Sequence, residues 1–401
     1  MDLAELTALL TPEGLRLVDE LGTIDGTDQV AAAVSRLRAA GLSPDLVSAA
    51  VGQARLRTRA RQKFGVFADR MLFTRAGLEQ ATRLEVGARH AGRFRDAGIA
   101  RLADLGCGIG GDALAFAGIG LDVLAVDADE VTAALAAYNL APFGDTARVL
   151  HARAQDVDLG DVEGVWLDPA RRTAGHTETT RVGAGDWSPP LEWVWERAAQ
   201  HPAGVKLGPA FDRTLVPDDA EAQWISVDGS TIELVVWTGR LARPGVRRAA
   251  LVIRGGAAAE LTGSADADDA DIRDLGPYVH EPEGAVIRAR LIGEVARSID
   301  AGMLDPRIAY LTSDAPALLP DGSPHPFVQS FRVRERLPND PKALGRALRE
   351  RGIGTLEIKK RGVDVDPAKL RATLKLRGSA SATLLLTRVG DRRLTLLADR
   401  V

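Results

Sequence analysis

A cluster of glycines follows a short apolar segment about a quarter of the way along the chain, where Arg101–Ala113 reads RLADLGCGIGGDA. Gly106, Gly108 and Gly110 let the backbone turn tightly and approach a ligand without an intervening Cβ atom. A helix expected from about Gly111 would direct its free amides at the same point. The spacing therefore predicts a nucleotide-binding turn. Gly106, Gly108 and Gly111 also satisfy the dinucleotide fingerprint G-x-G-x-x-G, and many turns of this kind bind no ligand.

Polar residues stand after three further apolar segments that have the length and composition of buried strands. Leu121–Val126 precedes Asp127, residues 147–151 precede Gln155 and Asp156, and the apolar run GVWL precedes Asp168 and Pro169. Because the carboxyl ends of parallel strands meet at one edge of a sheet, we expect these side chains to lie beside the glycine turn. Asp127 stands where an acidic residue binds the hydroxyls of a ribose.

Three more strands are expected, GVKLGP at Gly204–Pro209, QWISV at Gln223–Val227 and TIELVVWTG at Thr231–Gly239. A tight Asp228-Gly229 turn joins the last two into an antiparallel hairpin. With the motif DLGCGIGG, the acidic strand ends and this terminal hairpin, the chain resembles the class I S-adenosylmethionine-dependent methyltransferases. A nicotinamide-binding domain would lack both the hairpin and the Asp-Pro strand end, so a dehydrogenase is the weaker interpretation.

The resemblance implies S-adenosyl-L-methionine as the cofactor. It places Asp104 and the turn glycines around the methionine part, Asp127 on the ribose hydroxyls and Asp156 on the adenine amino group. The full expected cofactor-binding set is Asp104, Gly106, Gly108, Gly110, Asp112, Asp127, Ala128, Gln155, Asp156 and Asp168. No metal is expected, because the single cysteine, Cys107, lies inside the turn and the six histidines are scattered.

The segment after the fourth strand is the expected catalytic edge. Methyl transfer is an in-line displacement, so the protein must align an acceptor lone pair with the methyl carbon. Family members that methylate exocyclic amines carry Asp/Asn-Pro-Pro-aromatic here, whereas this chain reads Asp168-Pro169-Ala170-Arg171 and lacks the aromatic residue. Arg171 could stack on a base, pair with a phosphate or only support the loop. The segment 172–190 is expected to line the substrate mouth or to be a plain linker.

The same strand end also resembles that of the uridine carbon-5 methyltransferases, which need a cysteine nucleophile on the following strand. That strand ends Lys206-Leu207-Gly208-Pro209 here, so thiolate catalysis is excluded. We therefore expect transfer to a base nitrogen, with Asp168 orienting the acceptor. Pro169, Arg171 and Lys206 are the other catalytic candidates, although a lysine at a strand end can equally be structural.

Charge is spread unevenly over the 401 residues, of which 45% are hydrophobic and 26% charged. Residues 331–401 contain 18 Lys and Arg against 8 Asp and Glu, and the remainder has a net charge of -14. A basic module of this kind is typical of polyanion binding, although the charges could be a solvated surface. No apolar run reaches the ~20 residues that span a bilayer, and no signal-peptide pattern is present, so we expect a cytoplasmic protein without membrane contact.

A second basic run, Arg55, Arg57, Arg59, Arg61 and Lys63, lies near the N-terminus. At this spacing the five side chains wrap around a helix and do not line one face, so a solvated segment is favoured over a nucleic-acid contact. The following segment, 73–94, is expected to pack on the sheet or to cover the cofactor.

Four segments are expected. Residues 1–97 form a helical region, with a helix start at Thr11-Pro12-Glu13 and an interruption at Gly41–Pro44. Residues 98–245 form the core, an α/β fold with a seven-stranded Rossmann-like sheet. Residues 246–330 form an Ala/Asp-rich connector at 257–274 and a ferredoxin-like piece with an amphipathic helix after Tyr278. Residues 331–401 form a small basic α+β domain.

The texts YVHEPEGAVIRA and LEIKKRGVDVDPAKLRATLKLRG resemble a bacterial group of methyltransferases with a THUMP-like C-terminal domain. THUMP domains are associated with RNA-modifying enzymes, so the resemblance implies a structured RNA, tRNA or rRNA, bound through residues 331–401. Two other interpretations stay open: an RNA-binding or assembly factor with a vestigial cofactor site, and a methyltransferase of DNA, protein or a small molecule. The oligomeric state is not indicated.

Overall fold

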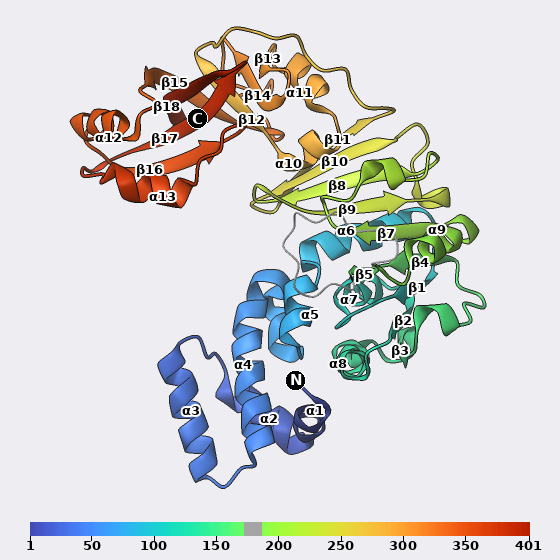
Figure 1. The fold of residues 1–401 in the computed structure, drawn as a ribbon. Coiled ribbons are helices and arrows are strands. Elements are labelled where there is room, and N and C mark those ends of the chain that lie inside the picture. Colours follow the sequence, from blue (N-terminus) through green and yellow to red (C-terminus); the bar gives the residue numbers. More distant parts are fainter. Residues whose placement is uncertain (172–186) are drawn as a thin grey trace. The chain divides into compact units, whose positions relative to one another are not determined.

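The computed structural model describes residues 1–171 and 187–401, which fold as two compact units (Figure 1). Unit 1 consists of Met1–Leu207 with Val236–Arg243, and unit 2 consists of Gly208–Val235 with Pro244–Val401. The units do not coincide with the four expected segments, because Gly208–Val235, expected in the core, folds within unit 2. The expected substrate-mouth segment lies mostly outside the described residues. Among the residues that are described, no helix has the length and apolarity needed to cross a lipid bilayer.

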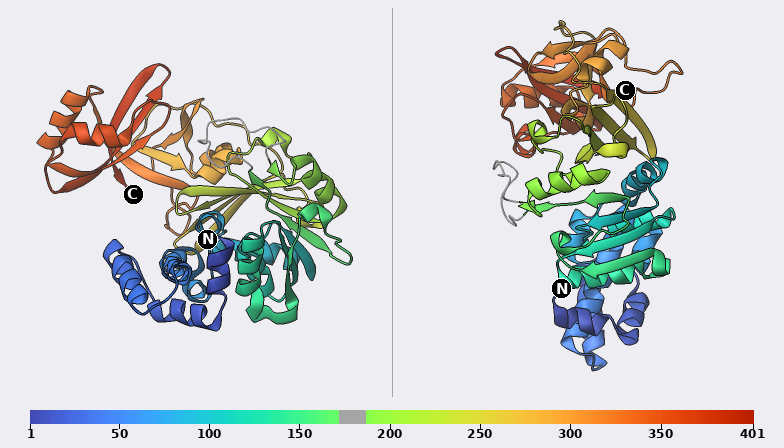
Figure 2. Two further views of the ribbon diagram at one scale, coloured as in Figure 1. Left: turned by 60° about the horizontal axis from the view of Figure 1, so that its bottom comes forward. Right: turned by 90° about the vertical axis from the view of Figure 1, so that its right-hand side faces the viewer.

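Unit 1 begins with helices, blue in Figures 1 and 2. They are α1 (Leu3–Leu9), α2 (Pro12–Leu21), α3 (Thr27–Ala39), α4 (Pro44–Phe64), the 3-10 helix η1 (Gly65–Arg70), α5 (Arg75–Gln80) and α6 (Leu84–Asp96). The helix start expected at Thr11 is confirmed, because its side chain accepts a hydrogen bond from Gly14 N and Pro12 takes the first helical position. Ser43 and Pro44 begin α4 in the same way.

The helices are followed by five parallel strands. They are β1 (Arg101–Leu105), β2 (Asp122–Asp127), β3 (Ala147–His151), β4 (Gly164–Leu167) and β7 (Ala203–Leu207), in the order β7-β4-β1-β2-β3. The connections contain α7 (Gly111–Gly118), α8 (Glu130–Leu140), η2 (Ala141–Thr146), η3 (Ala154–Asp156) and α9 (Leu191–Gln200). The strand order reverses between β1 and β4, and such a switch point is where open α/β sheets bind ligands.

Aromatic rings fix the helix α6 against this sheet. The Trp166 ring of β4 lies 5.8 Å from the Phe116 ring and 4.5 Å from the His90 ring, centroid to centroid. Phe94 of α6 lies 5.3 Å from Phe116. These large apolar side chains are fully buried, so α6 is held in a defined position beside the sheet.

Unit 2 begins with η5 (Arg213–Leu215) and the hairpin of β8 (Glu221–Val227) and β9 (Ser230–Trp237). Asp228 and Gly229 have φ values of 48° and 81°, the left-handed pair that a two-residue turn requires, so the expected hairpin is confirmed. The sequence predicted that this hairpin ends the sheet, but two further strands follow it. After η6 (Gly239–Leu241), β10 (Arg248–Arg254) pairs parallel with β8, and β11 (Ala257–Gly263) pairs antiparallel with β10.

The prediction of a connector at 257–274 is wrong in its first part, because Ala257–Gly263 form the strand β11. Gly255 and Gly256 have φ values of 54° and 80° and return the chain directly onto β10. The side chains of β11 are exposed or half-buried, because it is the edge strand of the order β11-β10-β8-β9. An Ala- and Glu-containing segment of this kind resembles a solvated linker until its partner strand is known.

The rest of unit 2 is a seven-stranded sheet in the order β13-β14-β12-β15-β18-β17-β16. Its strands are β12 (Tyr278–Pro282), β13 (Gly302–Asp305), β14 (Ile308–Ser313), β15 (Val328–Leu337), β16 (Ile353–Lys360), β17 (Ala380–Val389) and β18 (Arg392–Arg400). The single helix expected after Tyr278 is in fact two, α10 (Gly284–Arg288) and α11 (Ile292–Ser298), because Arg290 takes a φ of 60° between them.

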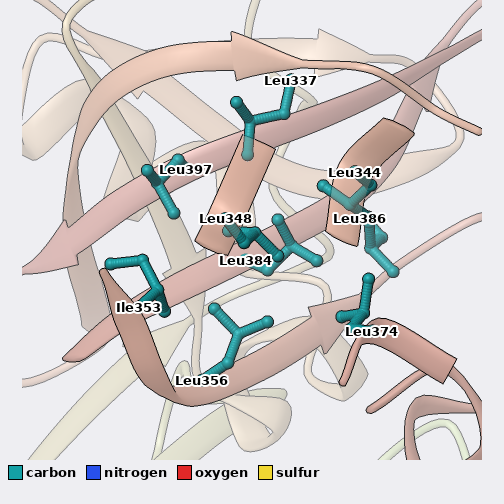
Figure 3. Packing of buried hydrophobic residues seen from close by; sticks show 9 residues of the cluster. All are labelled: Leu337, Leu344, Leu348, Ile353, Leu356, Leu374, Leu384, Leu386 and Leu397. Carbon is teal, nitrogen blue, oxygen red and sulfur yellow. The ribbon is translucent and has the colours of Figure 1, made fainter. Parts of the chain in front are cut away.

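Two further helices, α12 (Pro341–Glu350) and α13 (Pro367–Leu374), cover the C-terminal strands. Side chains from both helices and from β15 to β18 point toward one another in one apolar cluster (Figure 3). Its buried members are Leu337, Leu344, Leu348, Ile353, Leu356, Leu374, Leu384, Leu386 and Leu397. The α+β organisation expected for residues 331–401 therefore has a hydrophobic core of its own.

Candidate active site

The glycine turn joins β1 to α7 with three glycines in the left-handed region, at φ values of 99° for Gly106, 56° for Gly108 and 84° for Gly110. A Cβ atom on Gly106 would lie 2.8 Å from the carbonyl oxygen of Asp168, so only glycine fits where β1 and β4 end side by side. Gly110 is the N-cap of α7 and provides no side-chain cap. The first amides of α7 are therefore available at this edge of the sheet.

Asp127 ends β2 at the same edge. Its carboxylate accepts hydrogen bonds from Gly108 N and from Asp129 N, both at 2.9 Å. Burial raises the pKa of Asp127, while the two amides act in the opposite direction. The next residue, Ala128, is exposed, and its carbonyl oxygen lies 3.2 Å from His151 Nε2. The Asp127 carboxylate is thus fixed against the glycine turn.

Gln155 and Asp156 lie in η3, directly after β3. Gln155 is half-buried and Asp156 is exposed. Because β3 pairs parallel with β2, both residues lie at the same edge as Asp127, one strand further out. Neither side chain has a hydrogen-bond partner among the described residues, so both can contact a ligand.

Asp168 directly follows β4, Lys206 lies near the end of the neighbouring strand β7, and the two form an ion pair with 2.6 Å between Lys206 Nζ and Asp168 Oδ2. The Asp168 side chain remains 35% exposed, whereas that of Lys206 is 12% exposed. Pro169 is buried. The backbone of Arg171 pairs with Trp187 in the short ladder of β5 (Ala170–Arg171) and β6 (Trp187–Ser188), and the Arg171 side chain lies outside the described part of the chain.

Lys206 also contacts a second carboxylate, that of Asp112 in the first turn of α7, at 3.4 Å. Asp112 accepts a hydrogen bond from Thr82 Oγ1 at 2.7 Å and lies 3.0 Å from His90 Nδ1. Burial alone would raise the pKa of Asp112, but Lys206, His90 and Thr82 outweigh this effect and lower it. The sequence places Asp112 in the cofactor-binding set, whereas these protein groups occupy its carboxylate.

Asp104, in β1, is 1% exposed, and neither of its carboxylate oxygens has a hydrogen-bond partner in residues 1–171 and 187–401. Burial raises the pKa of Asp104 well above its usual range, and the carboxylates of Asp112 and Asp168 raise it further. A buried carboxylate without donors is costly unless a ligand supplies them. A ligand group that is cationic or rich in N–H donors would therefore stabilise the Asp104 carboxylate.

Comparison with known proteins gives the family. A model of THUMP domain-like sequences matches residues 328–400, and one of a domain of unknown function (DUF8688) matches residues 2–60. The chain is 34% identical over 343 residues to uncharacterized S-adenosylmethionine-dependent methyltransferases of Mycobacterium tuberculosis, strains CDC 1551 / Oshkosh and ATCC 25618 / H37Rv, a match that covers 84% of this chain and 91% of each relative. The chain belongs to the S-adenosylmethionine-dependent methyltransferases.

This methyltransferase shares its fold with a crystal structure of a candidate methyltransferase from Porphyromonas gingivalis W83. The TM-score is 0.69 at 20% identity, and the match covers 94% of this chain and 99% of the other. The expected fold class is thus confirmed. The cofactor of the family, S-adenosyl-L-methionine, has both a sulfonium and an ammonium group, and these cations match the unpartnered Asp104 carboxylate.

Three side chains of the site escaped the sequence analysis. Thr82 and His90 contact Asp112 from the segment 73–94, which is therefore packed on the glycine turn and the sheet. Asn139 of α8 accepts a hydrogen bond from Leu72 N at 2.7 Å and donates to Leu72 O at 3.0 Å and to Ile109 O, inside the turn, at 2.9 Å. Thr82 and Asn139 are single polar residues that belong to no motif. The only sequence signal was His90, a histidine on an otherwise apolar face of α6.

The candidate metal ligands of the described chain include its single cysteine. Within the described ranges, no group of three or more His, Cys, Asp and Glu residues is arranged to hold a metal ion. Cys107 is buried in the glycine turn, and burial raises the pKa of its thiol well above the usual range.

Proposed function

We propose that this methyltransferase modifies a base nitrogen of a structured RNA. The observation that carries the proposal is the ion pair of Asp168 and Lys206, in which a partly exposed carboxylate is fixed directly beside the glycine turn. A carboxylate accepts hydrogen bonds from an exocyclic amine and so orients the lone pair of its nitrogen. Lys206 fixes the position of that carboxylate. No cysteine occupies β7, so the acceptor is activated without a thiolate.

The cofactor, when bound, supplies an electrophilic methyl group on a sulfonium. In this proposal Asp104 and the glycine turn bind its methionine part, because the described part of the chain provides no donor to the carboxylate and the glycines of the turn have no Cβ atoms. Asp127 binds the ribose hydroxyls, and Asp156 with Gln155 binds the adenine. Asp112 acts through Lys206, Thr82 and His90 as a positioning residue.

The C-terminal domain supports RNA as the substrate. Four of its exposed cations, Lys342, Lys360, Arg392 and Arg393, have no ion-pair or hydrogen-bond partner for their side chains among the described residues. They share one end of the sheet, where β15, β16 and β17 end, β18 begins and α12 starts. Toward the other end some arginines are paired with carboxylates, as Arg334 is with Asp399 and Arg351 with Glu335. We assign the end that contains the four cations to RNA phosphates, a role that agrees with the THUMP domain-like match. The cytoplasmic location expected from the sequence is part of this proposal.

The proposal is tested with the purified protein, methyl-labelled cofactor and total RNA from a strain that lacks the gene. Nucleotide analysis should find the label in one methylated base. Labelling of DNA, protein or small molecules without labelling of RNA would contradict the substrate class. Binding of RNA without methyl transfer would point instead to an RNA-binding or assembly factor.

Binding of RNA by the C-terminal domain is tested with separate variants. Replacement of Lys342, Lys360, Arg392 and Arg393 by alanine should weaken RNA binding and reduce the slope of log affinity against log salt by roughly 3 to 4. The control, Arg334→Ala with Arg351→Ala, removes two arginines that are already paired with carboxylates and should change the slope much less for each charge removed. An equal change in both variants would contradict the assignment.

A further inference from the structure

Lysine is rare in the greater part of this chain. Of its seven lysines only two, Lys63 and Lys206, lie before residue 342, and every other Lys or Arg position before that residue is arginine. An ammonium group is a compact charge with three donors that point in different directions, whereas a guanidinium is a planar fork. The two lysines therefore identify places where the ammonium geometry can be required.

The basic run of α4 divides into exposed and buried side chains. Arg55 and Arg59 are exposed, as expected for a solvated segment. Arg57 is buried, and its guanidinium binds Asp19 Oδ1 at 2.7 Å. Lys63, the one lysine of the run, is half-buried near the end of the helix. The run is therefore only in part the solvated segment that the sequence predicted.

The ammonium group of Lys63 binds three carbonyl oxygens. It donates to those of Leu78 and Glu79 at 2.8 Å and to that of Ala81 at 2.7 Å. Leu78 and Glu79 belong to the last turn of α5, where carbonyl groups lack partners within the helix. All three donors of Lys63 are thus used on the backbone, and they fix the C-terminal end of α5 to α4.

The segment fixed in this way lies on the glycine turn. A Cβ atom on Gly77, in α5, would lie 2.5 Å from Cγ2 of Ile109. A Cβ atom on Gly111 would lie 3.6 Å from Cβ of Ala81 and 3.6 Å from Cζ of Phe64, which ends α4. The end of α4 and the end of α5 therefore both contact the first residue of α7.

Thr82 connects this segment to the catalytic edge. Its hydroxyl donates to Asp112 Oδ2 at 2.7 Å and accepts a hydrogen bond from Lys206 Nζ at 3.0 Å. The carbonyl group of Ala81, which Lys63 binds, belongs to the peptide unit that leads into Thr82. The contacts therefore form a continuous chain from the first lysine to the second.

We propose that Lys63 is a positioning residue for methyl transfer, which acts through Thr82 on the ammonium group of Lys206. Lys63 fixes the peptide unit between Ala81 and Thr82. The Thr82 hydroxyl then accepts one proton of Lys206, and the same ammonium group is directed at Asp168. The effect on the acceptor rests on the proposed function, in which Asp168 orients the acceptor, whereas the chain of contacts does not.

The charge of Lys63 responds to its surroundings. Burial and the positive charges of Arg83 and Lys206 lower its pKa to about 8, and Glu79 of α5 acts in the opposite direction. The native protein therefore loses this proton as the pH rises through about 8. A neutral amine has only two donors for three carbonyl oxygens, so α5 is held less firmly above that pH.

The first test is a double-mutant cycle in single-turnover methyl transfer by the full chain. Lys63→Met keeps the side-chain length but removes the three donors, and should lower the rate about tenfold while the cofactor Kd stays within about twofold. Thr82→Val keeps the shape but removes the hydroxyl, and should cause a similar loss. The double variant should match Thr82→Val within about twofold, because Lys63 acts through Thr82. Losses that multiply would overturn the proposal.

The second test is the pH profile of the same reaction. The ratio of the wild-type rate to that of Lys63→Met should fall as the pH rises through about 8, because the wild type then loses what the variant lacks. Lys63→Arg stays charged, so the ratio of its rate to that of Lys63→Met should not fall. Arg59→Met removes one exposed charge from the same helix and should keep the wild-type rate and profile. A constant ratio of wild type to Lys63→Met overturns the proposal.

The third test needs no substrate. With 13C at the Cε atoms of lysine, the seven signals can be followed by NMR, and Lys63→Met and Lys206→Met assign the two of interest. Both signals should change with one midpoint near pH 8, and the change at Lys206 should be lost in Thr82→Val. An undiminished change at Lys206 in Thr82→Val would show a direct effect of charge and overturn the proposal.

These outcomes separate the inference from the proposed function. The expected NMR changes, together with methylation of DNA, protein or a small molecule in place of RNA, retain Lys63 and contradict the proposed function, and the rate cycle is then measured on that substrate. Methylation of RNA with a Lys206 signal that ignores Lys63→Met retains the proposed function and overturns the inference. The Tm of each variant shows that a loss of rate is not a loss of fold.

Discussion

Lys206 Nζ lies 2.6 Å from Asp168 Oδ2 and 3.4 Å from Asp112 Oδ2, so one nearly buried ammonium group joins the carboxylate at the catalytic edge to a carboxylate at the start of α7. Lys206 lies in β7, Asp168 directly follows β4, and Asp112 lies in α7. Lys206 is therefore interpreted as the residue that fixes Asp168, and not as a group that touches the acceptor.

The first prediction concerns this lysine. Lys206→Met keeps the length of the side chain and removes its charge, which should lower kcat at least tenfold and leave the cofactor Kd within about twofold, because the glycine turn is unchanged. Stability should fall by about 3–5 kcal/mol, since Asp112 would lose a buried partner. Asp112→Asn is the comparison, because it loses a similar contact but preserves the pair with Asp168. Equal losses of kcat in both variants would contradict the positioning role.

The second prediction concerns Asp104. Its raised pKa means that the native state binds a proton more tightly than the unfolded state, so stability is lost as the pH rises through that pKa. Asp104→Asn should therefore raise the Tm of the cofactor-free protein at neutral pH and weaken cofactor binding tenfold or more. Asp122→Asn, at the exposed start of β2, is the control for Tm and Kd. Unchanged cofactor affinity in Asp104→Asn would remove Asp104 from the cofactor site.

The third prediction concerns the brace between the N-terminal helices and the glycine turn. Asn139→Leu conserves volume but leaves Leu72 N, Leu72 O and Ile109 O without partners. Each unsatisfied group costs about 1–3 kcal/mol, so the free energy of unfolding should fall by about 3 kcal/mol or more. Cofactor affinity should also fall, since Ile109 belongs to the turn. Calorimetric binding at a temperature where the variant is folded separates the two effects, and a Kd equal to that of the wild type would refute the coupling.

The fourth prediction concerns pH and unit 2. His280 is buried between the hydroxyls of Ser330 and Ser313, and burial, with the charge of His325, lowers its pKa to about 4. The native state therefore binds fewer protons than the unfolded state, and stability is lost as the pH falls below about 6.5. Between pH 7.5 and pH 5 the loss should be about 2 kcal/mol. Urea unfolding of His280→Gln should show a smaller loss over this range, and an unchanged loss would exclude His280 as its source.

Much of the site could be predicted because its backbone accepts few residue types. Gly106 stands where a Cβ atom would meet the Asp168 carbonyl, and Asp228-Gly229 forms a turn that few other pairs can form. Strand ends followed by carboxylates identify the ligand-binding edge of a parallel sheet, so Asp127, Asp156 and Asp168 could be placed together in advance.

The features that were missed depend on partners distant in the sequence. Asn139 acts on Leu72, and Arg57 is buried because Asp19 and Met71 O receive it, whereas Arg55 and Arg59 in the same run stay exposed. Strand β11 is a strand only because β10 pairs with it. Local composition has no information about such contacts, and tertiary structure decides them.

The central claim is that Asp168 orients the acceptor while other residues hold the cofactor. The most direct test is single-turnover methyl transfer to total RNA of the deletion strain by Asp168→Ala, with the cofactor Kd measured on the same preparation. The account predicts a loss of rate of about a hundredfold or more and a Kd within about twofold of the wild type. Asp168→Asn should be intermediate, because its amide oxygen still accepts a hydrogen bond. A wild-type rate in Asp168→Ala would contradict the account.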